Sequence, residues 1–307
     1  MGIFFRPVRP RDIPAQTSYP APCMTVRDAI TEATRVLNTG DARRDAETLL
    51  IDLLGHNRAW LLTHPRAPLT HEQLAAFDIL ISRRATGEPL QYITGHQEFY
   101  GLDFRVTPDV LIPRPETEIL VEAVLHWARE HHPADAPMRI ADVGTGSGAI
   151  AVALAAHLPQ AAITAVDIST AALAVAQANA TRLGYASRLT FQESDLLNAL
   201  LPAAATDPFD AIVSNPPYVP KTDAPILQRE VRDFEPHTAL FAGPDGLEIY
   251  RRLVPQARIA LRPGGLLAME FGFGQHEAFA SLLAGWQDVR LFDDLAGIPR
   301  IALAERP

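Results

Sequence analysis

A glycine-rich loop between a predicted strand and a predicted helix limits this chain to few folds. The apolar strand covers residues 138–143, the loop is Gly144-Thr145-Gly146-Ser147-Gly148, and the alanine-rich helix begins at Ala149. Glycines let backbone N–H groups approach a ligand closely, and the helix N-terminus faces it. A second apolar strand over 162–166 ends in Asp167, 19 residues past Gly148, where an acid commonly binds ribose hydroxyls. We therefore predict an α/β doubly wound sheet that binds an adenosine cofactor. The alternative role for Asp167 is a helix N-cap.

The spacing within the loop distinguishes between adenosine cofactors. The dinucleotide fingerprint is G-x-G-x-x-G, whereas this loop reads G-x-G-x-G and follows Asp142. A carboxyl group there suits a cationic ligand, and S-adenosylmethionine (SAM) carries a sulfonium and an ammonium group and no phosphate. Alternatively, Asp142 is a strand-end residue that binds loop N–H groups, and the two roles are compatible.

The tetrapeptide Asn215-Pro216-Pro217-Tyr218 follows the apolar strand 209–214. Two prolines end a central strand and stiffen the loop after it. The strands predicted in this half cover 138–143, 162–166, 188–192 and 209–214, and the first and fourth are neighbours at the switch point of a doubly wound sheet. The Asn215 amide is therefore expected beside the transferable methyl group. The alternative is an ordinary turn capped by asparagine.

Several further segments carry a family resemblance. They are Glu88–Gly95, Leu111-Ile112-Pro113-Arg114-Pro115-Glu116-Thr117-Glu118, Asp142–Gly148, Asn215–Tyr218, Glu235-Pro236, Gly243–Leu247 and Gly297–Arg300. With them the chain resembles, over about residues 24–305, the HemK/PrmC family of protein-(glutamine-N5) methyltransferases. The resemblance implies a class I SAM-dependent methyltransferase with a small N-terminal all-helical domain. It further implies that the substrate is the Gly-Gly-Gln glutamine of class-1 peptide chain release factors, a modification that supports translation termination.

The resemblance also implies roles for individual residues. The loop would hold the methionine portion of SAM, Asp167 the ribose, and Asp195-Leu196 the adenine, although Leu196 stands where family members often carry an aromatic residue and Asp195 is alternatively a loop-start cap. The expected cofactor-binding residues are Asp142, Gly144, Thr145, Gly146, Ser147, Gly148, Asp167, Asp195, Leu196 and Asn215.

The substrate amide would be held by the tetrapeptide. The Asn215 side-chain oxygen and the Pro216 backbone carbonyl would accept its two N–H hydrogens, and Tyr218 would stack on its plane. The expected catalytic residues are Asn215, Pro216 and Tyr218, and Pro217 joins them in binding substrate. No metal site is expected. By the resemblance, Arg114 to Thr117 lies near the entrance of the site; alternatively, Arg114 and Glu116 form an ion pair at a helix start.

The composition limits which partners and which cellular compartment can be expected for this chain. The formal net charge is −9, and among 27 basic residues only Lys221 is a lysine. Because proteins that bind nucleic acid directly usually carry a basic patch, a DNA or RNA adenine methyltransferase, which shares the Asn-Pro-Pro-Tyr loop, is disfavoured. The sequence is also compatible with a ribosomal-protein glutamine methyltransferase and, less well, with a nicotinamide-binding enzyme or a non-catalytic scaffold. One cysteine, Cys23, and the absence of a long apolar run predict a cytoplasmic protein without a membrane partner.

The chain is predicted to have four parts. They are a Pro-rich disordered extension over 1–22, a helical substrate-recognition domain over 23–95, a β-hairpin linker over 96–114 and the SAM-dependent methyltransferase domain over 115–307. The helices are expected after Thr25, Asp41 and Thr70. Strands at 265–270, 289–292 and 300–303 are expected to complete the sheet, the last one antiparallel.

Overall fold

The computed structural model describes residues 24–133 and 135–307. They divide into two compact units, of which the first ends at Ser82 and the second spans Arg83–Pro307. The extension predicted over 1–22 lies outside the described residues.

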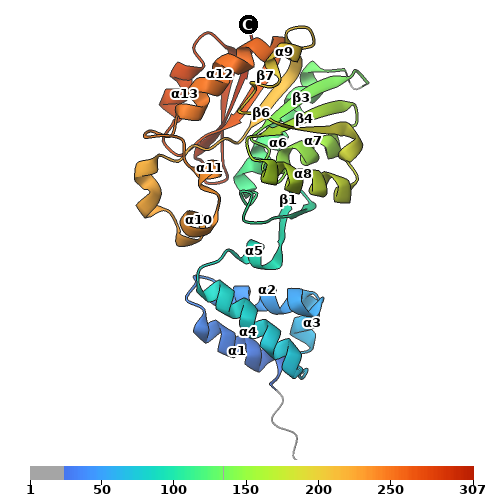
Figure 1. Cartoon of the computed structure of the whole chain (residues 1–307), viewed down its shortest axis with the longest axis vertical. Helices are drawn as coiled ribbons and strands as arrows, with labels where there is room; N and C mark the ends of the chain where they lie inside the picture. Colours follow the sequence, from blue (N-terminus) through green and yellow to red (C-terminus); the bar gives the residue numbers. More distant parts are fainter. Residues whose placement is uncertain (1–23, 134) are drawn as a thin grey trace, which may run out of the picture. The chain divides into compact units, whose positions relative to one another are not determined.

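The first unit is helical, as predicted. It contains α1 (Val26–Val36), α2 (Ala42–Leu54), α3 (Arg58–Thr63) and most of α4 (His71–Ala85) (Figure 1). Thr25 starts α1 with a capping box, in which its hydroxyl accepts the Asp28 N–H and the Asp28 carboxylate binds back to the Thr25 N–H. Thr70 and Gln73 make the same reciprocal pair before α4. The short helix α3 was not predicted, because six residues are too few for a clear period.

The second unit alternates strands and helices. Before the sheet come α5 (Leu90–Thr94), β1 (His96–Phe99), β2 (Leu102–Arg105) and α6 (Pro115–His131). The first half of the sheet region comprises β3 (Met138–Val143), α7 (Ala149–His157), β4 (Ala161–Asp167), α8 (Thr170–Leu183), η1 (Ala186–Arg188), β5 (Leu189–Glu193), α9 (Leu201–Ala204) and β6 (Phe209–Ser214). The second half comprises η2 (Lys221–Ile226), α10 (Arg229–Phe234), α11 (His237–Leu240), α12 (Glu248–Ala260), β7 (Leu261–Glu270), α13 (His276–Leu282), β8 (Gln287–Asp293) and β9 (Pro299–Glu305).

Seven of the nine strands in the described residues form one sheet in the order β5-β4-β3-β6-β7-β9-β8, and β1 and β2 pair as a separate antiparallel hairpin. Strands β3 to β7 are parallel, and β9 is antiparallel to both of its neighbours. The predicted adjacency of the first and fourth strands is confirmed, since β3 pairs with β6. Val143 pairs with Ser214, and Ser214 pairs with Met269. The loops that leave β3, β6 and β7 therefore begin side by side at one edge of the sheet.

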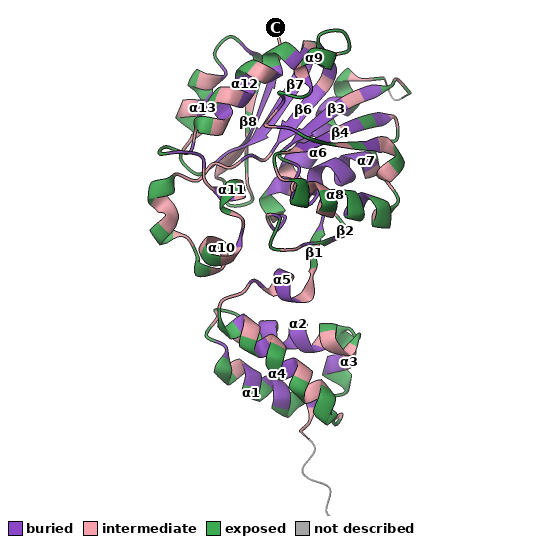
Figure 2. Ribbon diagram, viewed as in Figure 1, coloured by how far each residue is buried: buried purple, intermediate pink, exposed green. Residues whose placement is uncertain are grey.

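Helices cover both faces of this sheet. Successive strand residues alternate between the two faces, so that Ile140 joins the core with α6, α7 and α8, whereas Ala141 joins the core with α12 and α13. Figure 2 shows the buried strands at the centre and exposed residues on the outer sides of the helices. The sheet is thus a support with covered faces, and the loops at the C-terminal ends of its parallel strands are positioned to form a site.

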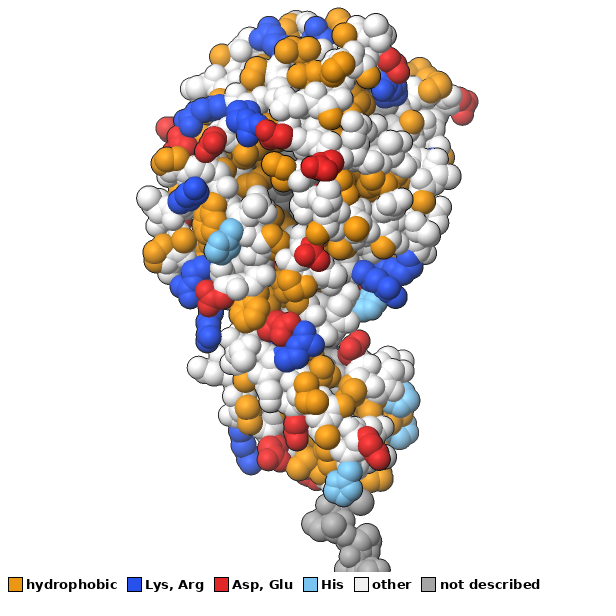
Figure 3. Space-filling model, viewed as in Figure 1, with side chains coloured by type: hydrophobic (Ala, Val, Ile, Leu, Met, Phe, Trp, Pro, Cys, Tyr) orange, Lys and Arg blue, Asp and Glu red, His pale blue; other side chains and the backbone are white. Residues whose placement is uncertain are grey.

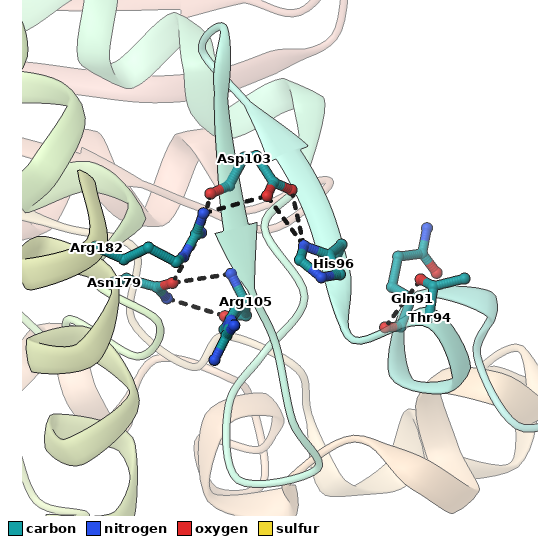
Figure 4. A network of polar contacts seen from close by, with 7 residues as sticks. All are labelled: Gln91, Thr94, His96, Asp103, Arg105, Asn179 and Arg182. Carbon is teal, nitrogen blue, oxygen red and sulfur yellow. Dashed lines mark hydrogen bonds and ion pairs between the residues drawn. The ribbon is translucent and has the colours of Figure 1, made fainter. Parts of the chain in front are cut away.

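The β1–β2 hairpin is fastened to α8 by side-chain hydrogen bonds (Figure 4). The buried Asn179 amide exchanges two hydrogen bonds with the backbone of Arg105, at 2.8 and 2.9 Å, and its nitrogen also donates to the Ser147 carbonyl at 3.0 Å. Arg182 adds an ion pair with Asp103 at 3.2 Å. One buried asparagine therefore connects the hairpin to the glycine loop.

The surface carries charges of both signs. On the visible face of each unit in Figure 3, basic and acidic side chains are interspersed with hydrophobic ones. Within the described part of the chain, no helix is long and apolar enough to cross a membrane. Nor do residues 24–133 and 135–307 gather three or more His, Cys, Asp or Glu side chains in an arrangement that holds a metal ion.

Candidate active site

A cavity of about 310 Å³ lies at the C-terminal ends of the parallel strands, where their loops begin. Most of the predicted site residues line it: Gly144, Gly146, Asp167, Asp195, Leu196, Asn215, Pro216 and Pro217. This volume suits a small-molecule ligand. The sequence motifs that lie after β3, β4, β5 and β6 thus meet in one place.

A second, smaller cavity of about 50 Å³ lies next to the glycine loop. Thr145 and Ser147 line it together with Arg114 and Thr117 of the segment before and at the start of α6. Asn215 lines both cavities. Its carboxamide is therefore placed where a cofactor in the larger cavity and a side chain in the smaller one would meet.

Asp142 is buried beneath the glycine loop. Its Oδ2 accepts the Thr145 hydroxyl at 2.6 Å and the Ala151 N–H at 3.2 Å, whereas its Oδ1 has no hydrogen-bond partner among the described residues. Burial raises the pKa of this carboxyl to about 7, against the two hydrogen bonds, which lower it. A buried carboxylate with one free oxygen is completed by a cationic donor, and the residues therefore fit SAM. The alternative strand-end role also holds, through Thr145 and Ala151.

The conformation of the glycine loop depends on its neighbours. The Gly146 N–H donates to Oδ2 of Asp167 at 2.9 Å. Gly148 has a φ of 81°, and a Cβ at that position would lie 3.0 Å from the Cβ of Ala176 on α8, so only glycine allows this approach. The N-cap role considered for Asp167 is wrong, because Ser169 caps α8 by accepting the Ala172 N–H. Asp167 instead braces the loop and faces the cavity.

An ion pair that the sequence did not predict lines part of the larger cavity. Asp195 Oδ2 lies 2.5 Å from the Arg252 guanidinium on α12, and both residues line the cavity. Asp195 does not have the alternative role of a loop-start cap. Ser194 has that role, because its hydroxyl accepts the Ala199 N–H. Leu196 lines the same cavity with a φ of 53°. No motif marks Arg252, which lies on the polar side of an amphipathic helix.

Hydrogen bonds link Asn215 to Thr117 and Thr117 to Glu270. The Asn215 Nδ2 donates to Thr117 Oγ1 at 3.0 Å, and the Thr117 hydroxyl donates to Glu270 Oε2 at 2.6 Å. The Tyr218 hydroxyl donates to the other Glu270 oxygen at 3.3 Å. Burial raises the pKa of Glu270 to about 7, while the bonds from Thr117 and Tyr218 oppose the rise. Burial and the charge of Glu270 raise the pKa of the Tyr218 phenol.

This placement differs from the one predicted for Tyr218. Tyr218 is absent from the described residues that line the two cavities and packs against the core beside α12. The expected stacking on a substrate amide therefore has no support, since the ring is turned toward Glu270. Thr117 belongs to the segment expected near the entrance, but its hydrogen bonds to Asn215 and Glu270 were not predicted, and neither was Glu270. The signal for Glu270 was an acid at the end of the buried strand predicted over 265–270.

Arg114 pairs with a partner far away in the chain. Its guanidinium binds Oε1 of Glu235, and Oε2 of Glu235 accepts the Ile112 N–H at 3.4 Å. The ion pair between Arg114 and Glu116 that was considered is thus wrong. Burial raises the pKa of Glu235, although Arg114 opposes the rise. The pair fixes the segment before α6 against the loop before α11.

The fold and the site together define a class I SAM-dependent methyltransferase. The doubly wound sheet, the glycine loop after its first strand, the acid after its second and the Asn-Pro-Pro-Tyr loop after its fourth are all in place. Residues 28–95 match the family model of the PrmC N-terminal domain, and residues 118–232 match that of the methyltransferase small domain.

Relatives of known name define the family. A release factor glutamine methyltransferase of Koribacter versatilis is 47% identical over 287 residues, which cover 92% of this chain and 99% of the relative. One of Moorella thermoacetica is also 47% identical, with the same coverage of both chains. The solved hMettl16 catalytic domain in complex with MAT2A 3′UTR hairpin 1 shares the fold, with a TM-score of 0.55 at 16% identity over 86% of this chain and 91% of that one. The chain belongs to the release factor glutamine methyltransferase family, and its cofactor is SAM.

Proposed function

We propose that this protein transfers a methyl group from SAM to the side-chain nitrogen (N5) of the glutamine in the Gly-Gly-Gln motif of class-1 peptide chain release factors, in the cytoplasm. Two facts support the substrate. Relatives that are named for this activity match the chain over nearly its full length. The observation that carries the proposal is the placement of Asn215 on both cavities, with its nitrogen already bound to Thr117.

The larger cavity would hold the cofactor, which supplies an electrophilic methyl group. We assign the methionine portion to the glycine loop over Asp142, because Asp142 Oδ1 is buried without a partner among the described residues. Gly144, Thr145, Gly146, Ser147 and Gly148 form that loop. We assign the ribose to Asp167 and the adenine to Asp195-Leu196, which line the same cavity. The aliphatic side chain of Leu196 would cover the base where an aromatic ring is absent.

The substrate amide is a poor nucleophile, because its nitrogen lone pair is delocalised into the carbonyl group. Asn215 Oδ1 and the Pro216 carbonyl would accept its two N–H hydrogens and fix the nitrogen toward the methyl group. Two preoriented dipoles would also stabilise the positive charge that develops on this nitrogen. Pro217 stiffens the loop behind them. The nitrogen releases a proton after transfer, so this arrangement needs no acidic or basic side chain at the methyl group.

We further propose that the helical region over 23–95 contributes to holding the release factor, with 96–114 as its connection to the methyltransferase domain over 115–307. The match of residues 28–95 to a domain of the same family supports this role.

Transfer of label from methyl-labelled SAM to a purified class-1 release factor tests the proposal. The control is the same factor with Gly-Gly-Ala in place of Gly-Gly-Gln. Label on the first and none on the second is the expected result. Equal labelling would place the methylated residue elsewhere on that factor. No label on either, with SAM binding intact, would refute the substrate and direct the assay to ribosomal proteins.

A further inference from the structure

The side chains below Asn215 have a fixed order of hydrogen-bond donors and acceptors. A threonine hydroxyl has one hydrogen, and an ionised carboxylate has none. The Thr117 Oγ1 lies 2.6 Å from Glu270 Oε2 and 3.0 Å from the Asn215 nitrogen. Above the Glu270 pKa of about 7, the single Thr117 hydrogen must therefore lie toward Glu270.

This order determines which end of the Asn215 amide meets Thr117. With its hydrogen committed to Glu270, Thr117 Oγ1 only accepts, so it must face the NH₂ end of Asn215. The Oδ1 end then faces away from Thr117, and Asn215 lines both cavities, so this oxygen is the end of the amide left to accept from a substrate. In a reversed amide, Asn215 Oδ1 would face Thr117 Oγ1, and two acceptors would meet. The Asn215 NH₂ group would then face the substrate NH₂ group, and two donors would meet.

We propose that Glu270 and Thr117 are positioning residues, which orient the Asn215 carboxamide so that its oxygen accepts from the substrate nitrogen. The inference rests on the proposed function for its substrate. Thr117 lines the smaller cavity, but its single hydrogen is committed to Glu270, so we assign both residues an effect on the reacting atoms through Asn215. Glu270 is 2% exposed and Thr117 is 4% exposed, so few water molecules can compete for the hydrogen bond between them.

The second oxygen of Glu270 couples the other end of the loop to the same carboxylate. Tyr218 donates to it from three residues beyond Asn215. Both ends of the Asn-Pro-Pro-Tyr loop are thereby tied to one carboxylate at the end of β7. A substitution at Glu270 is expected to affect the orientation of Asn215 more than the packing of the loop, since two prolines hold the backbone between them.

Substitutions at Thr117 test the proposal at pH 8. Thr117→Val keeps the shape but removes the hydroxyl, and we expect kcat for release-factor methylation to fall at least tenfold while the SAM Kd stays within twofold. Thr117→Ser restores the hydroxyl and is expected to recover most of the activity. Tyr250→Phe is the matched control, because it removes a buried hydroxyl that binds the Glu270 backbone carbonyl at 2.9 Å and not its carboxylate. A kcat for Thr117→Val equal to that of Thr117→Ser would overturn the proposal.

Glu270→Gln tests whether the Glu270 carboxylate fixes the direction of the Thr117 hydrogen bond. Its amide offers either a donor or an acceptor to Thr117, so the hydrogen of Thr117 is no longer committed, and we expect a loss of kcat similar to that of Thr117→Val. Because both act through one chain, the double variant should be no slower than either single variant. Additive losses would mean that the two residues act separately and would refute the proposal.

A measurement on the enzyme alone separates this inference from the substrate assignment. The ¹⁵N–¹H resonances of the Asn215 side-chain amide, identified by their loss in Asn215→Ala, report whether its NH₂ group is hydrogen-bonded. We expect them to shift in Thr117→Val and Glu270→Gln and to stay in place in Thr117→Ser. Unchanged resonances in all three variants would overturn the inference. Wild-type enzyme that fails to methylate the release factor, with the resonances behaving as expected, would refute only the substrate.

Discussion

The carboxylate of Asp167 accepts the backbone N–H of Gly146 at 2.9 Å and joins the end of β4 to the loop that leaves β3. Its other oxygen accepts the Ser169 N–H at 2.9 Å. One side chain thereby shapes the floor of the larger cavity and retains lone pairs for a ligand. The loop is held in position before any cofactor arrives, so binding need not order it.

Asp167→Ala is expected to weaken SAM binding about 10–100-fold, because charge-assisted hydrogen bonds are worth about 1.5–3 kcal/mol each. The variant would lose the proposed ribose contact together with the hydrogen bond that braces Gly146. Isothermal titration calorimetry measures the change. Glu193→Ala, which removes an exposed acid at the end of β5, is the matched control and should leave the Kd unchanged. An unaltered Kd in Asp167→Ala would refute the ribose assignment.

Asn215→Ala is expected to abolish methyl transfer while SAM still binds, since the substrate nitrogen loses one of its two acceptors. Single-turnover transfer and calorimetry on the same preparation separate the two effects. Asn198→Ala removes an exposed asparagine that binds Gln256 at 3.0 Å and should remain active. Activity of the Asn215 variant above about a tenth of wild type would contradict the positioning role, because preorganised dipoles at the reacting atom typically contribute more than that.

The affinity for SAM is expected to rise with pH through about 7. Burial raises the pKa of Asp142 to about 7, and the nearby charge of Asp167 acts in the same direction. Below this pH the free protein holds a proton on Asp142 that it must release to bind a cation, so the affinity falls by up to about tenfold per pH unit. Calorimetry at pH 6, 7 and 8 measures the slope. Asp142→Asn should bind more weakly at pH 8 and show a flat profile, whereas a wild-type slope in this variant would exclude Asp142 as its source.

Glu235→Ala is expected to destabilise the second unit by about 2–3 kcal/mol. Losing one partner of a fully buried ion pair costs about 3–5 kcal/mol, and Arg114 is 31% exposed, so water compensates part of the loss. Urea unfolding followed by tryptophan fluorescence measures it. Arg251→Ala, which breaks an exposed pair with Asp245, is the control without measurable effect. Equal midpoints for the two variants would show that the Arg114 pair is not structural.

The sequence was sufficient for the parts of the site that follow directly from strands. Gly144, Asp167 and Asn215 each come directly or shortly after a recognisable apolar strand, and the order of a doubly wound sheet brings such positions together. Their meeting in one cavity could therefore be predicted without coordinates.

The contacts below the site could not be predicted in this way. Thr117 and Glu270 are separated by 153 residues, and neither the period of α6 nor that of β7 indicates which side chain faces the other. The motif alone favours a Tyr218 ring that stacks on substrate, whereas burial turns this ring toward the core and its hydroxyl toward Glu270. Arg114 bonds to Glu235 and not to its near neighbour Glu116 for a similar reason, since tertiary packing selects the partner.

Helix α7 follows the glycine loop directly, and residues 149–155 of it are all buried. Backbone amides that are enclosed on every side exchange their hydrogens with solvent only when the surrounding structure opens as a whole. Deuterium uptake at α7 would then report the global stability of the second unit, which increases when SAM or a release factor binds the folded state alone. The change at α7 therefore measures the global effect of the ligand, and any different change in protection at the loops on binding SAM or a release factor is local to the site.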